Sequence, residues 1–384
     1  MKNLKVAIVH DWLYTLGGAE KVLASLLKCY PSADVFCLFD FLEGADRDLL
    51  KNSKVKTSFL QKMPFARTRH RHYLALMPLA IEQFDLGDYD LILSSSYAVA
   101  KGVLTGPDQL HVSYVHSPMR YAWDLQHEYL RASGIEKKFS GYLARGLLHW
   151  MRIWDSRTAH GVDEYIANSN FIARRIKKVY GRSAAVIYPP VAVSGALAPR
   201  TPKAPGEKGF FLTASRLVPY KNVRAVVEAF KFLPDERLVV VGTGPELHSL
   251  KEIAGDNVSF LGFVPTADLR QLMRDAEAFI FAAEEDFGII VVEAQSEGTP
   301  VLALGRGGVK EIVRLGDTPT GMFFEQPHPQ LIAETVGSFR GAQGSFTREA
   351  CYQNAHRFSE KEFEDGIKDF VEQSLIKFSD AAMI

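Results

Sequence analysis

The chain has few cysteines, balanced charge and no long apolar run. Its three cysteines, Cys29, Cys37 and Cys351, are scattered without a CxxC pair, so we expect neither a disulfide framework nor a zinc site. Basic and acidic residues both number 45, and this balance gives no sign of a nucleic-acid partner. No apolar run is long enough to span a bilayer, and residues 4–9 predict a buried strand rather than a signal peptide. These absences predict a cytoplasmic protein and leave contact with a membrane surface open.

The length and the pattern of the chain predict two α/β domains. A chain of 384 residues exceeds one typical core, and short apolar strands alternate with helices in both halves. Residues 188–208 hold five prolines and no periodicity, which indicates a linker. We therefore expect a first domain over 1–187 and a second over 209–358. The amphipathic helix in the remaining segment, 359–384, has no place in the second core, and we expect it to pack back on the first domain.

The stretch AEEDFGIIVVE, from Ala283 to Glu293, is the first candidate for a site. A short apolar strand precedes it, and the helix that it enters is stopped by Gly298 and Pro300. The loop over 284–288 thus joins the end of a strand to the start of a helix, where α/β sheets bind ligands and backbone N–H groups favour an anion. Glu293 puts a charge into an apolar helix, which is costly unless something pairs with it. The alternative is a partly exposed helix glutamate.

A second loop carries two cations in an equivalent place. The strand predicted over 210–214 is followed by the loop 215–222, which presents Arg216 and Lys221 at the strand's C-terminal edge. Arginine can hold a phosphate through two hydrogen bonds, and lysine adds a point charge. These residues are therefore candidates for an anion site, although surface cations need no such role.

The first half offers weaker candidates. Gly17 and Gly18 follow the first strand and open a helix, where the backbone can approach a ligand closely, but they do not form the GxGxxG fingerprint of a nicotinamide site. His116 ends a predicted strand, a place suited to facing a cleft and equally to a structural histidine. Asn168 ends another strand, and Ser169 after it is a candidate helix cap.

A basic and aromatic stretch runs from Lys54 to His72. Its lysines, arginines and histidines are interleaved with large apolar side chains. This composition suits contact with an anionic membrane or with an acidic acceptor. A solvated charged face is the alternative.

Taken together and in order, these motifs resemble a known family. SRLVPYKN at 215–222, two glutamates eight residues apart at 285 and 293, and GTPVLALGRGGVKE at 298–311 are similar to the retaining family 4 glycosyltransferases. The segments HDWL, HSPMRYAWD and EEDFGI resemble more narrowly the bacterial WbaZ-type mannosyltransferases of O-antigen and exopolysaccharide assembly. The resemblance implies the GT-B fold, an α/β architecture of two facing Rossmann-like domains with a cleft and a C-terminal helix that crosses back.

The resemblance also implies roles for individual residues. Arg216 and Lys221 would neutralise the donor diphosphate, Glu285 would bind sugar hydroxyls, and His116 would face the transferred sugar. The remaining donor-binding positions, from the first domain, the base pocket, the loop and the helix, would be Gly17, Gly18, Asn168, Val264, Asp286, Phe287, Gly288, Ile289, Ile290 and Glu293. Asp286 replaces the glycine that is commoner in the family, and an extra acid beside the sugar bears on donor choice.

The resemblance further implies the substrates. The donor would be GDP-mannose, no metal or other cofactor would be required, and the acceptor would be a polyprenyl-diphosphate-linked glycan at the inner face of the cell membrane, with the Lys54–His72 stretch in peripheral contact. Two short DxD matches, at 46–48 and 88–90, arise easily by chance, and we assign them no metal. A UDP-hexose donor, a nucleotide-sugar epimerase and a non-catalytic sugar-nucleotide-binding subunit are the alternatives.

Overall fold

The computed structural model describes residues 4–50, 53–193, 195–202 and 208–382, and the chain divides into two compact units. The first unit combines the residues up to Pro190 with those from Phe363 onward. The second unit is Val191–Glu362. Each has its own sheet and its own hydrophobic core, and each is described by itself.

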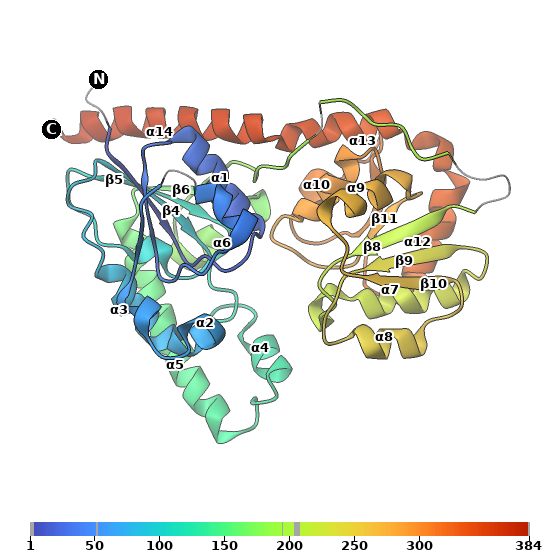
Figure 1. Ribbon diagram of the computed structural model, residues 1–384, viewed down its shortest axis with the longest axis horizontal. Coiled ribbons are helices and arrows are strands. Elements are labelled where there is room, and N and C mark those ends of the chain that lie inside the picture. Colours follow the sequence, from blue (N-terminus) through green and yellow to red (C-terminus); the bar gives the residue numbers. More distant parts are fainter. Residues whose placement is uncertain (1–3, 51–52, 194, 203–207, 383–384) are drawn as a thin grey trace. The chain divides into compact units, whose positions relative to one another are not determined.

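The first unit is built on a seven-stranded parallel sheet with the order β3-β2-β1-β4-β5-β6-β7 (Figure 1). Its central strands are buried along their whole length, because helices cover both faces of a parallel sheet and leave no solvent side for alternating polar residues. The strands are β1 Val6–His10, β2 Asp34–Cys37, β3 Val55–Thr57, β4 Leu91–Ser96, β5 Leu110–Val115, β6 Glu164–Ala167 and β7 Ala185–Val186.

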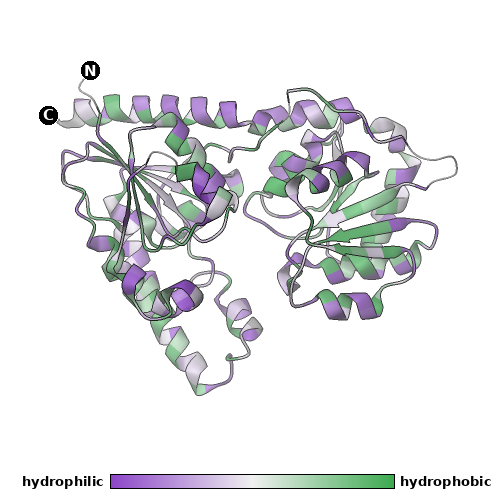
Figure 2. Cartoon of the chain, viewed as in Figure 1, coloured by the Kyte–Doolittle hydropathy of each residue, from purple (hydrophilic) through white to green (hydrophobic). Residues whose placement is uncertain are grey.

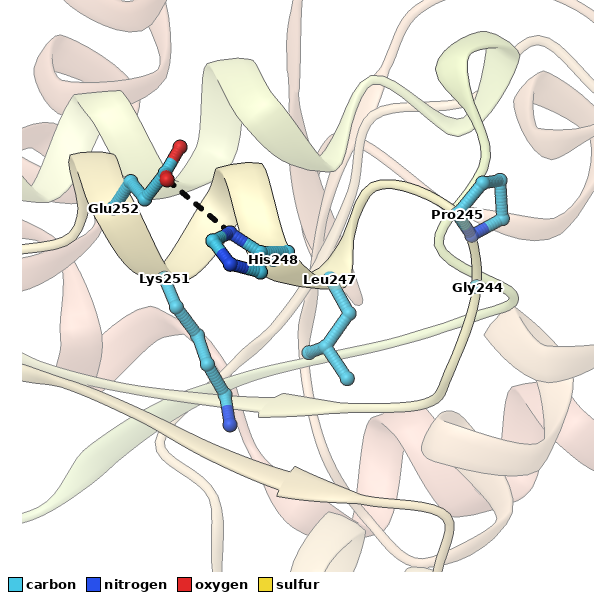
Figure 3. Close-up of a pocket in the computed structure, with 6 residues that line it drawn as sticks. All are labelled: Gly244, Pro245, Leu247, His248, Lys251 and Glu252. Carbon is cyan, nitrogen blue, oxygen red and sulfur yellow. Dashed lines mark ion pairs between the residues drawn. The ribbon is translucent and has the colours of Figure 1, made fainter.

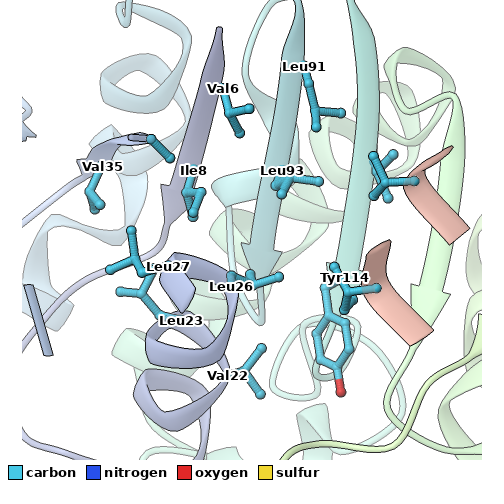
Figure 4. Close-up of a cluster of buried hydrophobic side chains, with 14 of the residues drawn as sticks. Val6, Ile8, Val22, Leu23, Leu26, Leu27, Val35, Leu91, Leu93 and Tyr114 are labelled. Carbon is cyan, nitrogen blue, oxygen red and sulfur yellow. The ribbon is translucent and has the colours of Figure 1, made fainter. Parts of the chain in front are cut away.

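Helices cover both faces of this sheet. The longer ones are α1 Gly18–Cys29, α4 Gln126–Ala132, α5 Phe139–Thr158 and α6 Asn170–Tyr180. The shorter ones are α2 Ala66–Arg69, α3 Met77–Glu82 and the 3₁₀ turns η1 Gly44–Leu50, η2 Phe59–Lys62, η3 His70–Leu76, η4 Ala100–Gly102 and η5 Ala159–Gly161. Figure 4 shows one core, in which Val22, Leu23, Leu26 and Leu27 of α1 pack against the strands.

The last helix, α14 Glu360–Ala382, contributes to that same core. Phe363, Ile367 and Val371 recur every four residues, so they lie on one face of the helix, and all three are buried against the first unit. The chain therefore completes its first unit with its last helix.

The second unit has a six-stranded parallel sheet with the order β10-β9-β8-β11-β12-β13. The strands are almost entirely hydrophobic (Figure 2) and are β8 Phe210–Ala214, β9 Arg237–Val241, β10 Val258–Gly262, β11 Phe279–Phe281, β12 Val301–Leu304 and β13 Gly321–Phe324. The helices are α7 Val223–Ala229, α8 Leu247–Ile253, α9 Thr266–Asp275, α10 Ile289–Ser296, α11 Val309–Ile312, α12 Pro329–Gly341 and α13 Arg348–Ala355, with 3₁₀ turns η6 Pro219–Lys221, η7 Phe230–Phe232, η8 Gln343–Ser345 and η9 His356–Phe358.

The unit boundaries differ from those expected at 187, 208 and 358. Val191 bridges Ser359, and the Arg200 guanidinium donates to the main-chain carbonyls of Arg274 and Ala276, so this part of the expected linker packs on the second unit. Residues 194 and 203–207 of that segment lie outside the described residues. The first strand, expected over 4–9, runs from Val6 to His10, whereas β8 has the bounds predicted over 210–214. In the described part of the chain, no helix combines the length and apolarity needed to cross a membrane.

Candidate functional site

The order of the second sheet reverses between β8 and β11, and two loops leave the sheet there. The loop after β8 holds Ser215–Asn222, and the loop after β11 holds Ala282–Gly288. In open α/β sheets the crevice outside the carboxyl ends of the strands at such a switch point is where ligands bind. Both loops that the sequence singled out therefore lie side by side at the expected edge.

Asn222 joins these two loops. Its backbone is in the left-handed region, with φ 54°, and its side-chain amide donates to the Ala282 carbonyl over 3.0 Å. Asparagine tolerates this conformation better than most residues. The strained turn brings the preceding residue, Lys221, against the second loop, where its ammonium pairs with the Glu285 carboxylate. The side chains of Lys221 and Glu285 are only 15% and 23% exposed, so water screens the pair weakly.

Two glycines of the loop after β12 fix the path of the second loop. A Cβ on Gly307 would lie 2.3 Å from the Glu285 carbonyl oxygen, and one on Gly308 would lie 2.4 Å from that of Asp286. The Gly308 N–H donates to the Glu285 carbonyl over 2.9 Å. Any side chain at these two positions would push the loop away, so the EEDFG loop can take its observed path only because Gly307 and Gly308 have no side chain.

The same loop turns directly into α10. Phe287 is buried with its ring edge-on to Phe358, and Gly288 takes φ 101° immediately before Ile289 starts the helix. The first backbone N–H groups of a helix have no partner within it, and they favour an anion. Glu293 lies one turn after Ile290, three residues along and on the same helix face.

A pocket of about 480 Å³ opens at the carboxyl ends of β8, β9 and β10. Arg216, Val264 and Ile290, which the sequence assigned to donor binding, all line it. The other lining residues are Ala214, Ser215, Val241, Gly242, Thr243, Gly244, Phe263 and Leu269. A cation, an apolar wall and a helix start thus meet in one pocket, and this combination suits a ligand with both an anionic and an apolar part.

Sequence reasoning missed several of these lining residues. Phe263 is 79% exposed directly after β10, beside Val264, and an aromatic residue at the end of a predicted strand was the available signal. Gly242 has φ 128°, and a Cβ there would lie 1.9 Å from the Ser215 carbonyl oxygen. Only glycine allows the β9 loop to pack so closely on the loop that carries Arg216.

A second pocket, of about 570 Å³, lies beside the first along α8 and shares Gly244 with it (Figure 3). His248 and Glu252 approach within 3.2 Å one turn apart, and Figure 3 shows Lys251 extending away from this pair. Both members are largely exposed. This pair is a solvated contact on a helix surface, and it adds nothing to the chemistry of the first pocket.

The first-unit candidates form a separate group at the ends of β1, β4, β5 and β6. Burial lowers the pKa of the His116 imidazole to about 3, so its ring is neutral at physiological pH. The Asn168 side-chain amide donates to the His116 carbonyl over 2.9 Å. Ser169 caps α6 by accepting from the Ile172 N–H, which confirms the cap that the sequence predicted.

A chain of polar contacts runs from His116 to the glycine pair. Ser95 Oγ lies 2.8 Å from His116 Nε2 and 3.1 Å from His10 Nδ1. His10 Nε2 lies 3.7 Å from the Glu20 carboxylate, which also accepts from the Gly17 N–H over 2.9 Å at the start of α1. Glu20, the glutamate of the GGAE sequence, thus caps the start of α1. It is also linked through His10 and Ser95 to His116 at the end of β5.

Three further buried charged residues shape this group, and the sequence did not reveal their roles. The Asp11 carboxylate accepts from four successive backbone N–H groups over 97–100, while its burial, the larger effect, raises its pKa. Lys101 pairs with Asp155 at 2.8 Å, with both side chains fully buried. These residues hold loops in place and have satisfied partners, so we assign them no role in chemistry. Asp11, a charge directly after a buried strand, was the available signal.

Comparisons with known proteins agree with this geometry. A family model described as Glycosyltransferase Family 4 matches residues 16–194, and one described as Glycosyl transferases group 1 matches residues 198–358. The two adjoin and together span most of the chain. The chain therefore belongs to the family 4 glycosyltransferases.

One similar sequence is a Corynebacterium glutamicum protein named GDP-mannose-dependent monoacylated alpha-(1-6)-phosphatidylinositol monomannoside mannosyltransferase. It is 32% identical to this chain over a match that covers 46% of this chain and 52% of the relative's length. A Mycolicibacterium smegmatis GDP-mannose-dependent alpha-(1-6)-phosphatidylinositol monomannoside mannosyltransferase is 30% identical over 43% of this chain and 50% of its own. The chain matches about half the length of these relatives.

Solved structures resemble the chain over nearly its whole length. HepE of Anabaena in complex with UDP has a TM-score of 0.68 at 21% identity. The match covers 96% of this chain and 100% of the HepE chain. Sucrose-phosphate synthase from Thermosynechococcus elongatus has a TM-score of 0.71 at 15% identity, with coverage of 98% and 100%. The chain has the GT-B fold, as the sequence predicted. The cleft expected between its domains stays a prediction.

Proposed function

We propose that the protein is a retaining glycosyltransferase that moves mannose from GDP-mannose to a polyprenyl-diphosphate-linked glycan of a bacterial surface polysaccharide. The meeting of Arg216, the Lys221–Glu285 pair and the start of α10 at one edge of the second sheet carries the proposal. The names of the two mannosyltransferase relatives support the choice of donor. The resemblance of several sequence segments to WbaZ-type enzymes supports the choice of acceptor.

In this proposal the donor diphosphate displaces Glu285 from Lys221. Lys221 and Arg216 then face the oxygen that gains negative charge as the bond from the sugar's anomeric carbon to the diphosphate breaks, and fixed cations stabilise that charge. Because these side chains supply the positive charge, the reaction requires no metal or other cofactor. The released Glu285 accepts hydrogen bonds from sugar hydroxyls.

The other donor contacts follow from the pocket. The apolar wall beside Val264 and Phe263 receives the base, and Glu293, on the helix face that Ile290 shares, accepts from the ribose hydroxyls. The N–H groups over 287–290 hold the sugar and phosphate, with Asp286 beside the sugar. In the first unit, the backbone of Gly17 and Gly18 approaches the donor phosphate and acceptor, His116 faces the transferred sugar, and Asn168 is a further donor contact.

Retention follows from attack on the face that the leaving group vacates. The acceptor oxygen bonds to the anomeric carbon on that face, and its proton passes to the departing phosphate oxygen. No nucleophile of the protein is needed. The membrane-bound acceptor places the enzyme at the cytoplasmic face of the membrane, with the Lys54–His72 stretch as one candidate contact.

Thermal stabilisation by nucleotides tests the donor. A ligand that binds only the folded state raises the melting temperature. We expect GDP and GDP-mannose, with EDTA present, to raise it by more than UDP, ADP or their sugar conjugates. A selective rise with UDP compounds would replace GDP-mannose by a UDP-hexose, which the UDP complex of HepE makes the second candidate. No rise with any nucleotide would reject the transferase proposal.

Transfer to a synthetic polyprenyl-diphosphate sugar tests the rest. We expect an α-mannosyl product, identified by its anomeric proton, because the α configuration of the donor is retained. A β product would reject retention, and consumption of donor without an acceptor to give another sugar nucleotide would indicate an epimerase.

A further inference from the structure

The long helix α5 exposes an apolar face. Phe139, Tyr142, Leu143, Trp150 and Ile153 are between 43% and 77% exposed. At 3.6 residues per turn all five fall within an arc of about 100° around the helix axis. They form one stripe along the helix, with the exposed Gly146 between Leu143 and Trp150, and the stripe is named here the α5 stripe.

The opposite face of α5 already fills the core. Leu148, Met151 and Trp154 are buried against the cluster that includes Ala80 of α3 and Ala100 of η4. The stripe is therefore not the side by which the helix attaches to its own unit. An exposed face with five large apolar side chains marks a surface that another body covers.

The charges of α5 identify the chemistry of that body. The helix carries Arg145, Arg152 and Arg157, and its one acidic residue, Asp155, is fully buried in the pair with Lys101. Arg157 pairs with Glu82 at 3.0 Å and Arg152 donates to the Ala122 carbonyl, so the cations left for a partner are Arg145 and those that precede the helix. Two exposed lysines at 137 and 138 precede the helix directly. An apolar stripe with cations beside it and with Tyr and Trp in it has the composition of a helix that lies in the interface of an anionic bilayer.

We propose that the α5 stripe docks the protein on an anionic lipid surface. The proposal rests on the proposed function in one respect, that a lipid-linked acceptor gives the enzyme a reason to be there. It differs from the contact expected through Lys54–His72. That stretch is split among β3, η2, α2 and η3, and two of its cations are paired, Arg67 with Glu43 at 2.8 Å and Lys56 with Asp34 at 3.7 Å.

Flotation with vesicles of phosphatidylglycerol and phosphatidylethanolamine tests the stripe. We expect the wild-type protein to float and the triple variant Phe139→Ser/Leu143→Ser/Ile153→Ser to bind at least about tenfold more weakly. The matched control is Phe232→Ser/Leu315→Ser/Ile376→Ser, which removes three side chains of similar exposure elsewhere and should float like the wild type. Equal flotation of the stripe variant and the wild type would overturn the proposal.

Trp150 provides a test on the unmodified protein surface. Brominated lipids in the vesicles should quench the tryptophan emission of the wild type but not that of Trp150→Phe, whose other three tryptophans are less exposed. Equal quenching in both proteins would overturn the proposal. So would a wild-type dimer in sedimentation that the stripe variant converts to a monomer, because a second copy would then cover the stripe. Flotation needs neither nucleotide nor acceptor, so its failure leaves the transferase proposal standing.

Discussion

Lys221 is held by Glu285 in the structure, and the proposed donor would exchange that partner for a diphosphate. We expect Lys221→Ala to lower kcat by about a hundredfold to a thousandfold, the usual loss when one group that stabilises transition-state charge is removed. The melting temperature should change little, because the Glu285 carboxylate is 23% exposed and can be hydrated once its partner is removed, and the cost of desolvating both charges offsets much of what the pair contributes. The measurement is the transfer rate at saturating donor. Lys310→Ala, an exposed cation of the same unit, is the control, and a near-wild-type rate in the Lys221 variant would remove its role.

Ser95 has one hydroxyl proton and two histidine neighbours, so at most one ring can accept from it, and at least one ring must donate to it. The Glu20 carboxylate near His10 Nε2 favours the proton on that nitrogen, which leaves His10 Nδ1 as acceptor in the neutral ring. Ser95 then donates to His10 and accepts from His116 Nε2–H. The free lone pair at His116 Nδ1 would accept from a sugar hydroxyl.

Nitrogen NMR of histidine-labelled protein tests this arrangement. We expect His116 as the Nε2–H tautomer in the wild type and as a mixture of tautomers in Ser95→Ala. Nucleotide affinity should be unchanged, because the pocket proposed for the nucleotide is lined by residues of the other unit. The spectrum of His116→Gln assigns the signal. An Nδ1–H tautomer in the wild type would contradict the argument.

The element that depends most on its neighbours is the loop over 284–288 with α10. In Gly308→Ala the new Cβ would lie 2.4 Å from the Asp286 carbonyl oxygen and 2.6 Å from Phe287 Cα, both backbone atoms that cannot turn aside. We expect the loop to shift and the transfer rate to fall about a hundredfold, as for other misplaced site groups.

The control for this variant is Gly337→Ala in α12, where a Cβ meets nothing within 4 Å. This control should keep the full rate and gain about 0.5–1 kcal/mol in the free energy of unfolding, since alanine favours a helix interior. Equal transfer rates in the two variants would show that the loop position does not matter.

Strands of this kind were predictable because parallel strands buried on both faces give short apolar runs, and β8 has the bounds predicted over 210–214. The contact of Lys221 with Glu285 was not predictable from pattern, because it depends on β8 and β11 being neighbours, and strand order is not written in any local segment. For the same reason the sequence did not predict the hydrogen bonds of Asp11. Its carboxylate accepts from four backbone N–H groups of a loop 86 to 89 residues later in the chain. The exposure of the α5 stripe was not predictable either, because apolar residues at this helical spacing are typical of the buried face of any helix.

At the scale of the whole molecule, the first unit depends on α14. We expect Ile367→Ala to lower the free energy of unfolding of that unit by about 2–5 kcal/mol, because the residue is 1% exposed and its loss leaves a cavity. Ile376→Ala, 58% exposed on the same helix, should stay within about 0.5 kcal/mol of wild type. Urea unfolding measures the free energy of unfolding, and hydrogen exchange shows whether its decrease belongs to the first unit. A similar small change in both variants would show that α14 is not part of that core.

This division of the first unit has a consequence for synthesis on the ribosome. Residues up to Pro190 emerge early, yet Phe363, Ile367 and Val371, which complete their core, emerge only after the whole second unit. At roughly 5–20 residues per second the wait is on the order of ten to thirty seconds. The nascent first unit spends that time with an apolar face uncovered, a face for a chaperone to bind. The second unit is continuous in sequence and can finish folding first, so the order of folding reverses the order of translation.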